Sequence, residues 1–225
     1  MIHLIDVSLL KNHRDYTLLY SGQFISFIGT MITGVALPWQ IYQLTHSSWM
    51  VGLLSLVQLL PLLLTALLGG GYADRYNRQN LVILSEFILI GGCAALAINA
   101  SLLQPNLPTI YVVSAVMSAI TGLHRPALES MTQQLVSPEK YKAVSALVLF
   151  KFSFCMIVGP AIGGLLIACY GITITYLVDL FSFFLSLITL KLMCPLQTPT
   201  ADEHPPILKA LHEGLTFAMS RQELI

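Results

Sequence analysis

Long apolar runs separated by short polar stretches dominate this chain. A window of about 19 residues, the length that a helix needs to cross a hydrocarbon layer of about 30 Å, finds six such runs. We expect transmembrane helices near residues 17–38, 50–71, 81–101, 109–131, 144–168 and 173–193. The pattern therefore predicts an all-α membrane protein with six transmembrane helices.

The composition agrees with this interpretation. Of the 225 residues, 56% are hydrophobic and only 10% are charged, and the mean hydropathy is +0.76, which is high for a soluble domain. Eleven basic and eleven acidic residues cancel, so the net charge does not indicate a nucleic-acid partner. The cysteines lack metal-ligand spacing, and we expect all four to be small core residues: Cys93, Cys155, Cys169 and Cys194.

The basic residues fall on one side of the predicted membrane. Nine of the eleven lie before the first span, in every second connection, or after the sixth span, and the alternate connections contain none. The positive-inside rule then places both termini in the cytoplasm. We expect a cytoplasmic segment at 1–16, the transmembrane bundle at 17–193, and a cytoplasmic linker with an amphipathic helix at 194–225.

The connection between the second and third spans, GGYADRYNRQN, concentrates charge at residues 70–80. Gly70 and Asp74 share a helical face, so a neighbouring helix can approach Gly70 while Asp74 contacts the N-terminus of that helix. Arg75 and Arg78 can pair with carboxylates on adjacent helix ends. We interpret the cluster as a conformational latch between moving bundles. The alternative is a short anchoring loop, which needs only the arginines.

A second pattern, VGPAIGGLL, lies in the fifth predicted span. Gly159 and Gly163 form a face of small residues that favours close helix packing, and Pro160 removes a backbone donor and bends the helix. Packing motifs of this kind are common in membrane helices, so the pattern alone indicates contact between helices and no particular function.

Together the two patterns resemble signatures of the major facilitator superfamily of transporters. The residues that match its signature loop are Gly70, Ala73, Asp74, Arg75 and Arg78. The residues that match the fifth-helix motif of its drug and proton antiporters are Gly159, Pro160, Gly163 and Gly164. The chain departs from the two patterns at Tyr72, which replaces an apolar residue, at Asn77 and Cys155, which replace glycines, and at Gln79, which replaces a basic residue.

Within the superfamily the chain is most similar to the enterobactin exporter group of Gram-negative bacteria. The similarity runs over nearly the whole chain and includes VSLLKNH, QFISFIG, GVALPWQIYQLTHSSWMVGL and EHPPILKAL. It implies an inverted three-plus-three repeat of six helices that forms one half of a twelve-helix transporter in the bacterial inner membrane. It also implies a partner, either a second six-helix half missing from this chain or a second copy in a homodimer.

Polar side chains inside the predicted spans are the candidates for contact with a substrate or a proton. A charge near the bilayer centre costs about 2.5 to 3.5 kcal/mol on insertion scales, so we expect partners or a wet cavity. The candidates are Gln23, Gln58, Glu86, Arg125, Glu129, Lys151 and Asp179. Glu86 and Asp179 are the proton-carrier candidates, and snorkelling or structural pairing is the alternative for each residue.

Several of these candidates have expected partners. Arg125 and Glu129 are four residues apart on one helix and can pair locally. Lys151 and Glu86 lie at similar depth and can pair across helices. His124 is either a proton shuttle or a hydrogen-bonded structural histidine.

We therefore expect a secondary active exporter of a small organic molecule, a siderophore or a drug, that works by proton antiport in the lipid bilayer. The alternative is a truncated or partner-dependent six-span module with no transport of its own. An intramembrane enzyme is disfavoured, because the sequence has no G-x-S-G serine motif, no H-E-x-x-H zinc pair and no intramembrane aspartate pair. We predict no catalytic residue, no cofactor and no metal.

Overall fold

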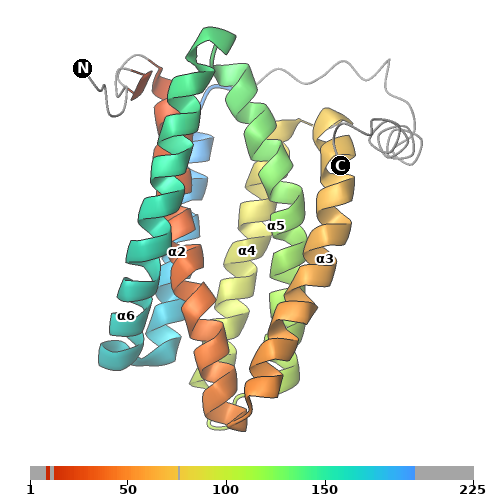
Figure 1. Ribbon diagram of the computed structural model, residues 1–225, viewed down its shortest axis with the longest axis vertical. Coiled ribbons are helices and arrows are strands. Elements are labelled where there is room, and N and C mark those ends of the chain that lie inside the picture. The colour runs from red at the N-terminus through yellow and green to blue at the C-terminus, as the bar shows by residue number, and fades with distance from the viewer. Residues whose placement is uncertain (1–8, 11–12, 76, 196–225) are drawn as a thin grey trace, which may run out of the picture.

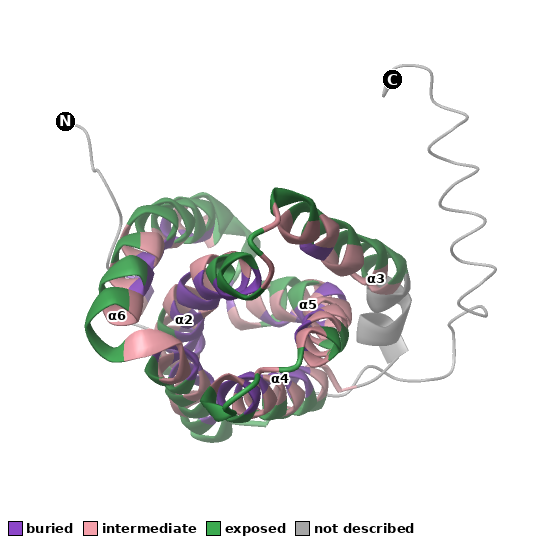
Figure 2. Ribbon diagram, turned by 90° about the horizontal axis from the view of Figure 1, so that it is seen from below, coloured by how far each residue is buried: buried purple, intermediate pink, exposed green. Residues whose placement is uncertain are grey.

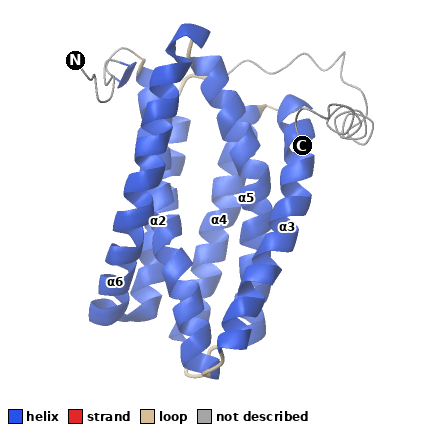
Figure 3. Cartoon of the chain, in the orientation of Figure 1, coloured by secondary structure: helices blue, strands red, loops and turns tan. Residues whose placement is uncertain are grey.

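The computed structural model describes residues 9–10, 13–75 and 77–195, and the side chains of all of these except 68–75. This part of the chain consists of helices and short loops and contains no strand (Figure 3). The helices run side by side along the long axis of the molecule (Figure 1). In chain order they are α2 (Arg14–Thr45), α3 (Ser48–Arg75), α4 (Arg78–Ser101), α5 (Leu107–Leu135), the 3-10 helix η1 (Pro138–Lys140) and α6 (Tyr141–Lys191).

Five of these helices are long and apolar enough to cross a membrane. Within the described residues the candidate spans are Arg14–Thr45, Ser48–Leu67, Arg78–Ser101, Leu107–Leu135 and Pro138–Lys191. The first four overlap the first four spans predicted from the sequence. The last covers both the fifth and the sixth predicted spans, so α6 needs separate description.

α6 contains a sharp break at Gly171. A straight α-helix of its 51 residues would be about 76 Å long, more than twice the thickness of a hydrocarbon layer. Gly171 has φ 80° and ψ 173°, a conformation that glycine adopts without a steric penalty. Residues 141–170 form a first arm and residues 172–191 a second arm, and Figure 1 shows them, teal and blue, meeting at the end of the bundle opposite the N-terminus.

Short polar connections set the ends of the other helices. The side-chain oxygens of Asn77 and Asn106 accept hydrogen bonds from the backbone N–H groups of Asn80 and Thr109, which caps the starts of α4 and α5. His46 ends α2 in the left-handed conformation, with φ 49°. These caps let consecutive long helices reverse direction over few residues.

The bundle is apolar on its outside and carries polar side chains inside. α2 packs mainly on α6, α3 on α5, and α4 on both α5 and α6. Figure 2, which looks along the bundle, shows buried residues on the inward faces and exposed ones on the outer faces of α3 and α6. Leu60, Ile157 and Leu165 are among the exposed apolar side chains, whereas Glu86 and Asp179 are fully buried. This distribution suits a lipid environment.

The small residues of the fifth-span pattern lie against α2 from the first arm of α6. A Cβ atom on Gly159 would collide with the side chain of Met31, and one on Gly163 would lie 3.3 Å from the Cα atom of Ile32. A Cβ atom on Gly164 would meet nothing within 4 Å. Pro160 lies within the helix between the two contacting glycines. Gly159 and Gly163 therefore permit close approach of the two helices, and Gly164 is not needed for it.

The predicted latch lies largely outside the part of the chain whose side chains are described. Gly70, Asp74 and Arg75 are at the C-terminal end of α3, within the stretch 68–75 that has no described side chains, and Arg78 begins α4. The latch therefore stays a prediction. The predicted terminal segments are also mostly outside, since residues 1–8 and 196–225 are not described.

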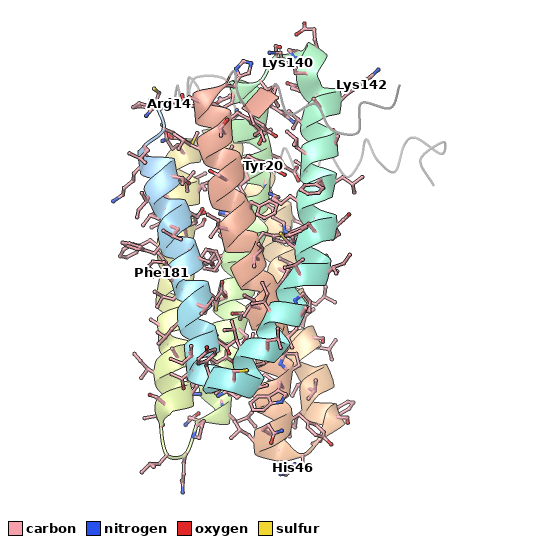
Figure 4. All side chains as sticks on the ribbon, turned by 90° about the vertical axis from the view of Figure 1, so that its left-hand side faces the viewer. Arg14, Tyr20, His46, Lys140, Lys142 and Phe181 are labelled. Carbon is pink, nitrogen blue, oxygen red and sulfur yellow. The ribbon has the colours of Figure 1, made fainter. Side chains whose placement is uncertain are left out.

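Basic residues gather at one end of the bundle, and the four cysteines differ in their exposure. Arg14, Lys140 and Lys142 lie at one end of the bundle, and His46 lies at the other (Figure 4). Two of the cysteines, Cys93 and Cys155, are buried. The prediction of four core cysteines is wrong for Cys169 and Cys194, which are exposed because they lie close to the ends of the two arms of α6.

Candidate functional site

A cavity of about 240 Å³ opens between α2, α5 and the two arms of α6. Four of the seven polar candidates from the sequence line it: Gln23, Arg125, Glu129 and Lys151. His124 lines it as well. These side chains come from α2, α5 and α6, and the folding of the bundle brings them to one space.

Aromatic rings form the apolar part of the lining. Phe27, Phe152 and Phe183 border the cavity, and the rings of Phe27 and Phe152 are stacked with their centroids 5.8 Å apart. Lys151 Nζ lies 5.9 Å from the centroid of the Phe27 ring, within reach of a cation–π interaction. The lining combines two cations, one carboxylate and aromatic rings, which suits an organic molecule that has polar groups and an apolar body.

The two ion pairs expected from the sequence do not form. In the described part of the chain, no ion pair joins Arg125 to Glu129 or Lys151 to Glu86. Arg125 and Glu129 are both exposed and border the cavity, so spacing along the helix permits their contact without enforcing it. Lys151 lies over Phe27, while the Glu86 carboxylate is bound by α2 and the second arm of α6.

Glu86 is fully buried where α4 meets α2 and the second arm of α6. Its Oε1 atom accepts a hydrogen bond from Gln23 Nε2 at 2.6 Å and another from Ser186 Oγ at 2.6 Å. Its Oε2 atom has no hydrogen-bond partner among the described residues. His124 Nε2 lies 3.8 Å from Glu86 Oε1 and also has no hydrogen-bond partner there. Only one oxygen of this carboxylate is therefore satisfied.

Asp179 is also fully buried, on the second arm of α6, but both of its oxygens are bonded. The Oδ2 atom accepts hydrogen bonds from Thr33 Oγ1 and, at 3.4 Å, from Cys93 Sγ. The Oδ1 atom lies 3.2 Å from Ser182 Oγ, whose one hydroxyl proton is shared between Oδ1 and the backbone carbonyl oxygen of Asp179, 2.7 Å away. Asp179 is not part of the cavity lining. Its surroundings join three helices through one carboxylate.

The remaining predicted candidate, Gln58, is half-buried on α3 and does not line the cavity. The sequence analysis missed the serines that support the two carboxylates. Asp179, Ser182 and Ser186 are spaced by three and four residues in an otherwise apolar run, so they share one helical face. That spacing is the signal that predicts a buried polar seam.

Comparison with known proteins gives the chain a family. The family model described as "transmembrane secretion effector" matches residues 10–225. The enterobactin exporter EntS of Shigella boydii serotype 18 is 32% identical over 218 residues, which cover 96% of this chain and 52% of that protein. The same figures hold for the enterobactin exporter EntS of Escherichia coli O1:K1 / APEC. The chain thus spans about half the length of the curated relatives it matches.

A solved structure agrees at the level of the fold. The crystal structure of a peptide transporter POT in complex with alafosfalin matches with a TM-score of 0.63 and 16% sequence identity. The match covers 92% of this chain and 44% of that one. Three observations agree: the helical architecture, the match to the family model, and the 32% identity that extends over 96% of this chain. The chain belongs to the transmembrane secretion effector family of the major facilitator superfamily.

Proposed function

We propose that this chain forms one half of a secondary active transporter that exports a small organic molecule, a siderophore or a drug, from the cell by proton antiport. The observation that carries the proposal is the cavity inside a bundle of membrane-length helices, where the cations of Arg125 and Lys151 face the same space as aromatic rings. The names of relatives that are 32% identical, enterobactin exporters, support export of a siderophore and transport rather than catalysis.

The proposed architecture is six spans in an inverted three-plus-three repeat, with the two arms of α6 as the fifth and sixth spans. Such a repeat relates the first span to the fourth, the second to the fifth and the third to the sixth. The packing of α2 on α6 then corresponds to the packing of α5 on α3, and both are extensive. The break at Gly171 supports the division of α6 into two spans.

The proposed setting is the bacterial inner membrane, with both termini in the cytoplasm. Arg14, Lys140 and Lys142 gather at one end of the bundle, as the positive-inside rule requires of a cytoplasmic face (Figure 4). A second six-helix half, or a second copy of this chain, would supply the other wall of the path, because the relatives are about twice as long. Gly70, Asp74, Arg75 and Arg78 would form the latch between the halves.

Transport by reconstituted vesicles tests the proposal. The chain and its presumed second half would be reconstituted with their cytoplasmic side outward in vesicles that are acidic inside. Accumulation of a siderophore or a fluorescent drug in the vesicles would be measured. We expect accumulation that depends on the pH gradient and falls at least tenfold, about 1.4 kcal/mol, in the double variant Arg125→Gln, Lys151→Gln. Gln58→Leu, on α3 outside the cavity, is the matched control. Accumulation that does not depend on the pH gradient would rule out proton antiport. The absence of any accumulation would favour the alternative, a six-span module with no transport of its own.

A further inference from the structure

The carboxyl group of Glu86 is fully buried, and its set of hydrogen-bond donors is incomplete. A buried charge is tolerated when it is paired and its hydrogen-bonding capacity is filled, and is otherwise expensive inside a membrane bundle. The side chain of Glu86 is fully buried, and the two donors that reach it, Gln23 and Ser186, are neutral. Both donate to the same oxygen, so Oε2 has no partner in the described structure. The site can therefore accept one further donor or a proton.

His124 occupies the position from which such a group can come. It projects from α5, is 7% exposed, and borders the cavity. Its Nε2 atom lies 3.8 Å from Glu86 Oε1, and closing that gap to about 2.9 Å would make a hydrogen bond. Imidazole is the side chain whose charge ordinarily changes near neutral pH. His124 therefore lies between the buried carboxylate and the cavity, with a ring nitrogen that has no hydrogen-bond partner in the described residues.

We propose that Glu86 and His124 bind one exchangeable proton as a pair, and that His124 passes this proton between the cavity and Glu86. The inference rests on the proposed function and deepens it, because it names the groups that carry the coupling proton. A hydronium ion in the cavity gives the proton to the pair and becomes water, and the net charge of the pair changes from −1 to 0. Release to water in the cavity reverses the step.

Within the described structure, the side chains that surround Glu86 and His124 are either neutral or lie at the cavity lining. α2 and the second arm of α6 face Glu86 with the neutral side chains of Gln23 and Ser186. The other charged residues nearby border the cavity: Arg125 and Glu129 from α5, and Lys151 from the first arm of α6. Asp179 lies apart from the lining and has its own donors. Gln23 is a positioning residue, since it donates to Oε1, the oxygen that His124 Nε2 approaches.

Infrared difference spectroscopy of the full chain in lipid bilayers tests this pair. Spectra would be compared between about pH 8 and about pH 5, the range in which histidine changes charge, to find the carbonyl band of a protonated carboxyl group. We expect this band in the parent chain, its loss in Glu86→Gln, and its retention in the matched variant Asp179→Asn. His124→Gln should move the pH at which the band appears and leave its intensity at the lowest pH unchanged.

Each outcome decides the question. A band that survives Glu86→Gln and disappears in Asp179→Asn would place the proton on Asp179 and overturn the proposal. The absence of any pH-dependent carboxyl band in the folded parent would overturn it too, and so would a His124→Gln variant that titrates like the parent. Because the measurement needs no transport, its failure leaves the export proposal standing. A protein that shows the pH-dependent carboxyl band but does not export the substrate would count against the proposed function alone.

Discussion

Glu86 and Asp179 are two fully buried carboxylates on neighbouring helices of one bundle, and their surroundings differ in kind. Asp179 accepts from Thr33, Cys93 and Ser182 through both oxygens and lies away from the cavity. Glu86 uses one oxygen only. A buried polar network in which every acceptor has a donor fixes the packing of its helices. A network with an acceptor that lacks a donor can bind a further group reversibly.

The two sites also share a structural feature, the close approach of α2 to the second arm of α6. Gly22 lies beside the Glu86 site and Gly29 beside the Asp179 site, and a Cβ atom at either would collide with side chains of that arm. At Gly29 the colliding atoms belong to Asp179 and Ser182, which are already hydrogen-bonded to each other. The Asp179 site should therefore be more sensitive to added volume than the Glu86 site.

The largest expected effect on stability is from Gly29→Ala. The added methyl group must displace the Asp179 carboxylate or the Ser182 side chain, and overpacking of this kind costs about 1 to 3 kcal/mol. Thermal unfolding in detergent should show a clearly lower midpoint. Gly34→Ala, one of the exposed positions of the same helix with nothing within 4 Å, is the control and should be neutral or stabilising. Equal midpoints for the two variants would show that the Asp179 site is not tightly packed.

A smaller effect separates the isosteric variants of the two acids. In Asp179→Asn an amide nitrogen must replace an oxygen that accepts a hydrogen bond, so we expect a loss of about 1 to 2 kcal/mol. In Glu86→Gln the nitrogen can take the place of Oε2, which accepts none in the described structure, so stability should stay within about 1 kcal/mol of the parent. Unfolding curves measured side by side would refute the comparison if Glu86→Gln were the less stable variant.

The smallest expected effect concerns the thiol that donates to Asp179. Cys93→Ala removes a weak donor with a sulfur–oxygen distance of 3.4 Å, and Cys155→Ala removes a buried thiol whose sulfur lies 3.9 Å from the carbonyl oxygen of Phe24. Both variants lose the same atoms, so the difference between them compares the thiol contact with a carboxylate to the longer thiol contact with a backbone carbonyl oxygen. We expect Cys93→Ala to be less stable by about 0.5 kcal/mol. A difference of the opposite sign would mean that the thiol contributes nothing to the Asp179 site.

The contrast between the two acids was not available from the sequence, although much of the fold was. Apolar runs predicted the long helices, because length and hydropathy depend on local composition. The gap between the fifth and sixth predicted spans contains Gly171, where α6 breaks. Glu86 and Asp179 were named together as proton carriers. Side chains from other helices determine which of the two has an oxygen without a hydrogen-bond donor, and sequence spacing does not determine those contacts.

The same limit explains the ion pairs that were expected and do not form. Spacing by four residues brings Arg125 and Glu129 to one face of α5, but that face borders the cavity, and the side chains have space to lie apart. Similar depth was the reason to pair Lys151 with Glu86. Depth along the bundle is set by position in the sequence, whereas the direction in which a side chain points around the helix depends on packing. Gln58 was named only because it is a polar residue inside a predicted span, and it lies on α3 outside the cavity lining.

We propose that Glu86 carries the coupling proton and that Asp179 holds the helices together. The most direct test is export driven by a pH gradient in vesicles that contain this chain and its presumed second half, with each variant normalised to the amount of folded protein. Glu86→Gln should lower gradient-driven export at least tenfold, about 1.4 kcal/mol, while Asp179→Asn keeps most of it. Normal coupled export by Glu86→Gln, together with its loss in Asp179→Asn, would contradict the claim.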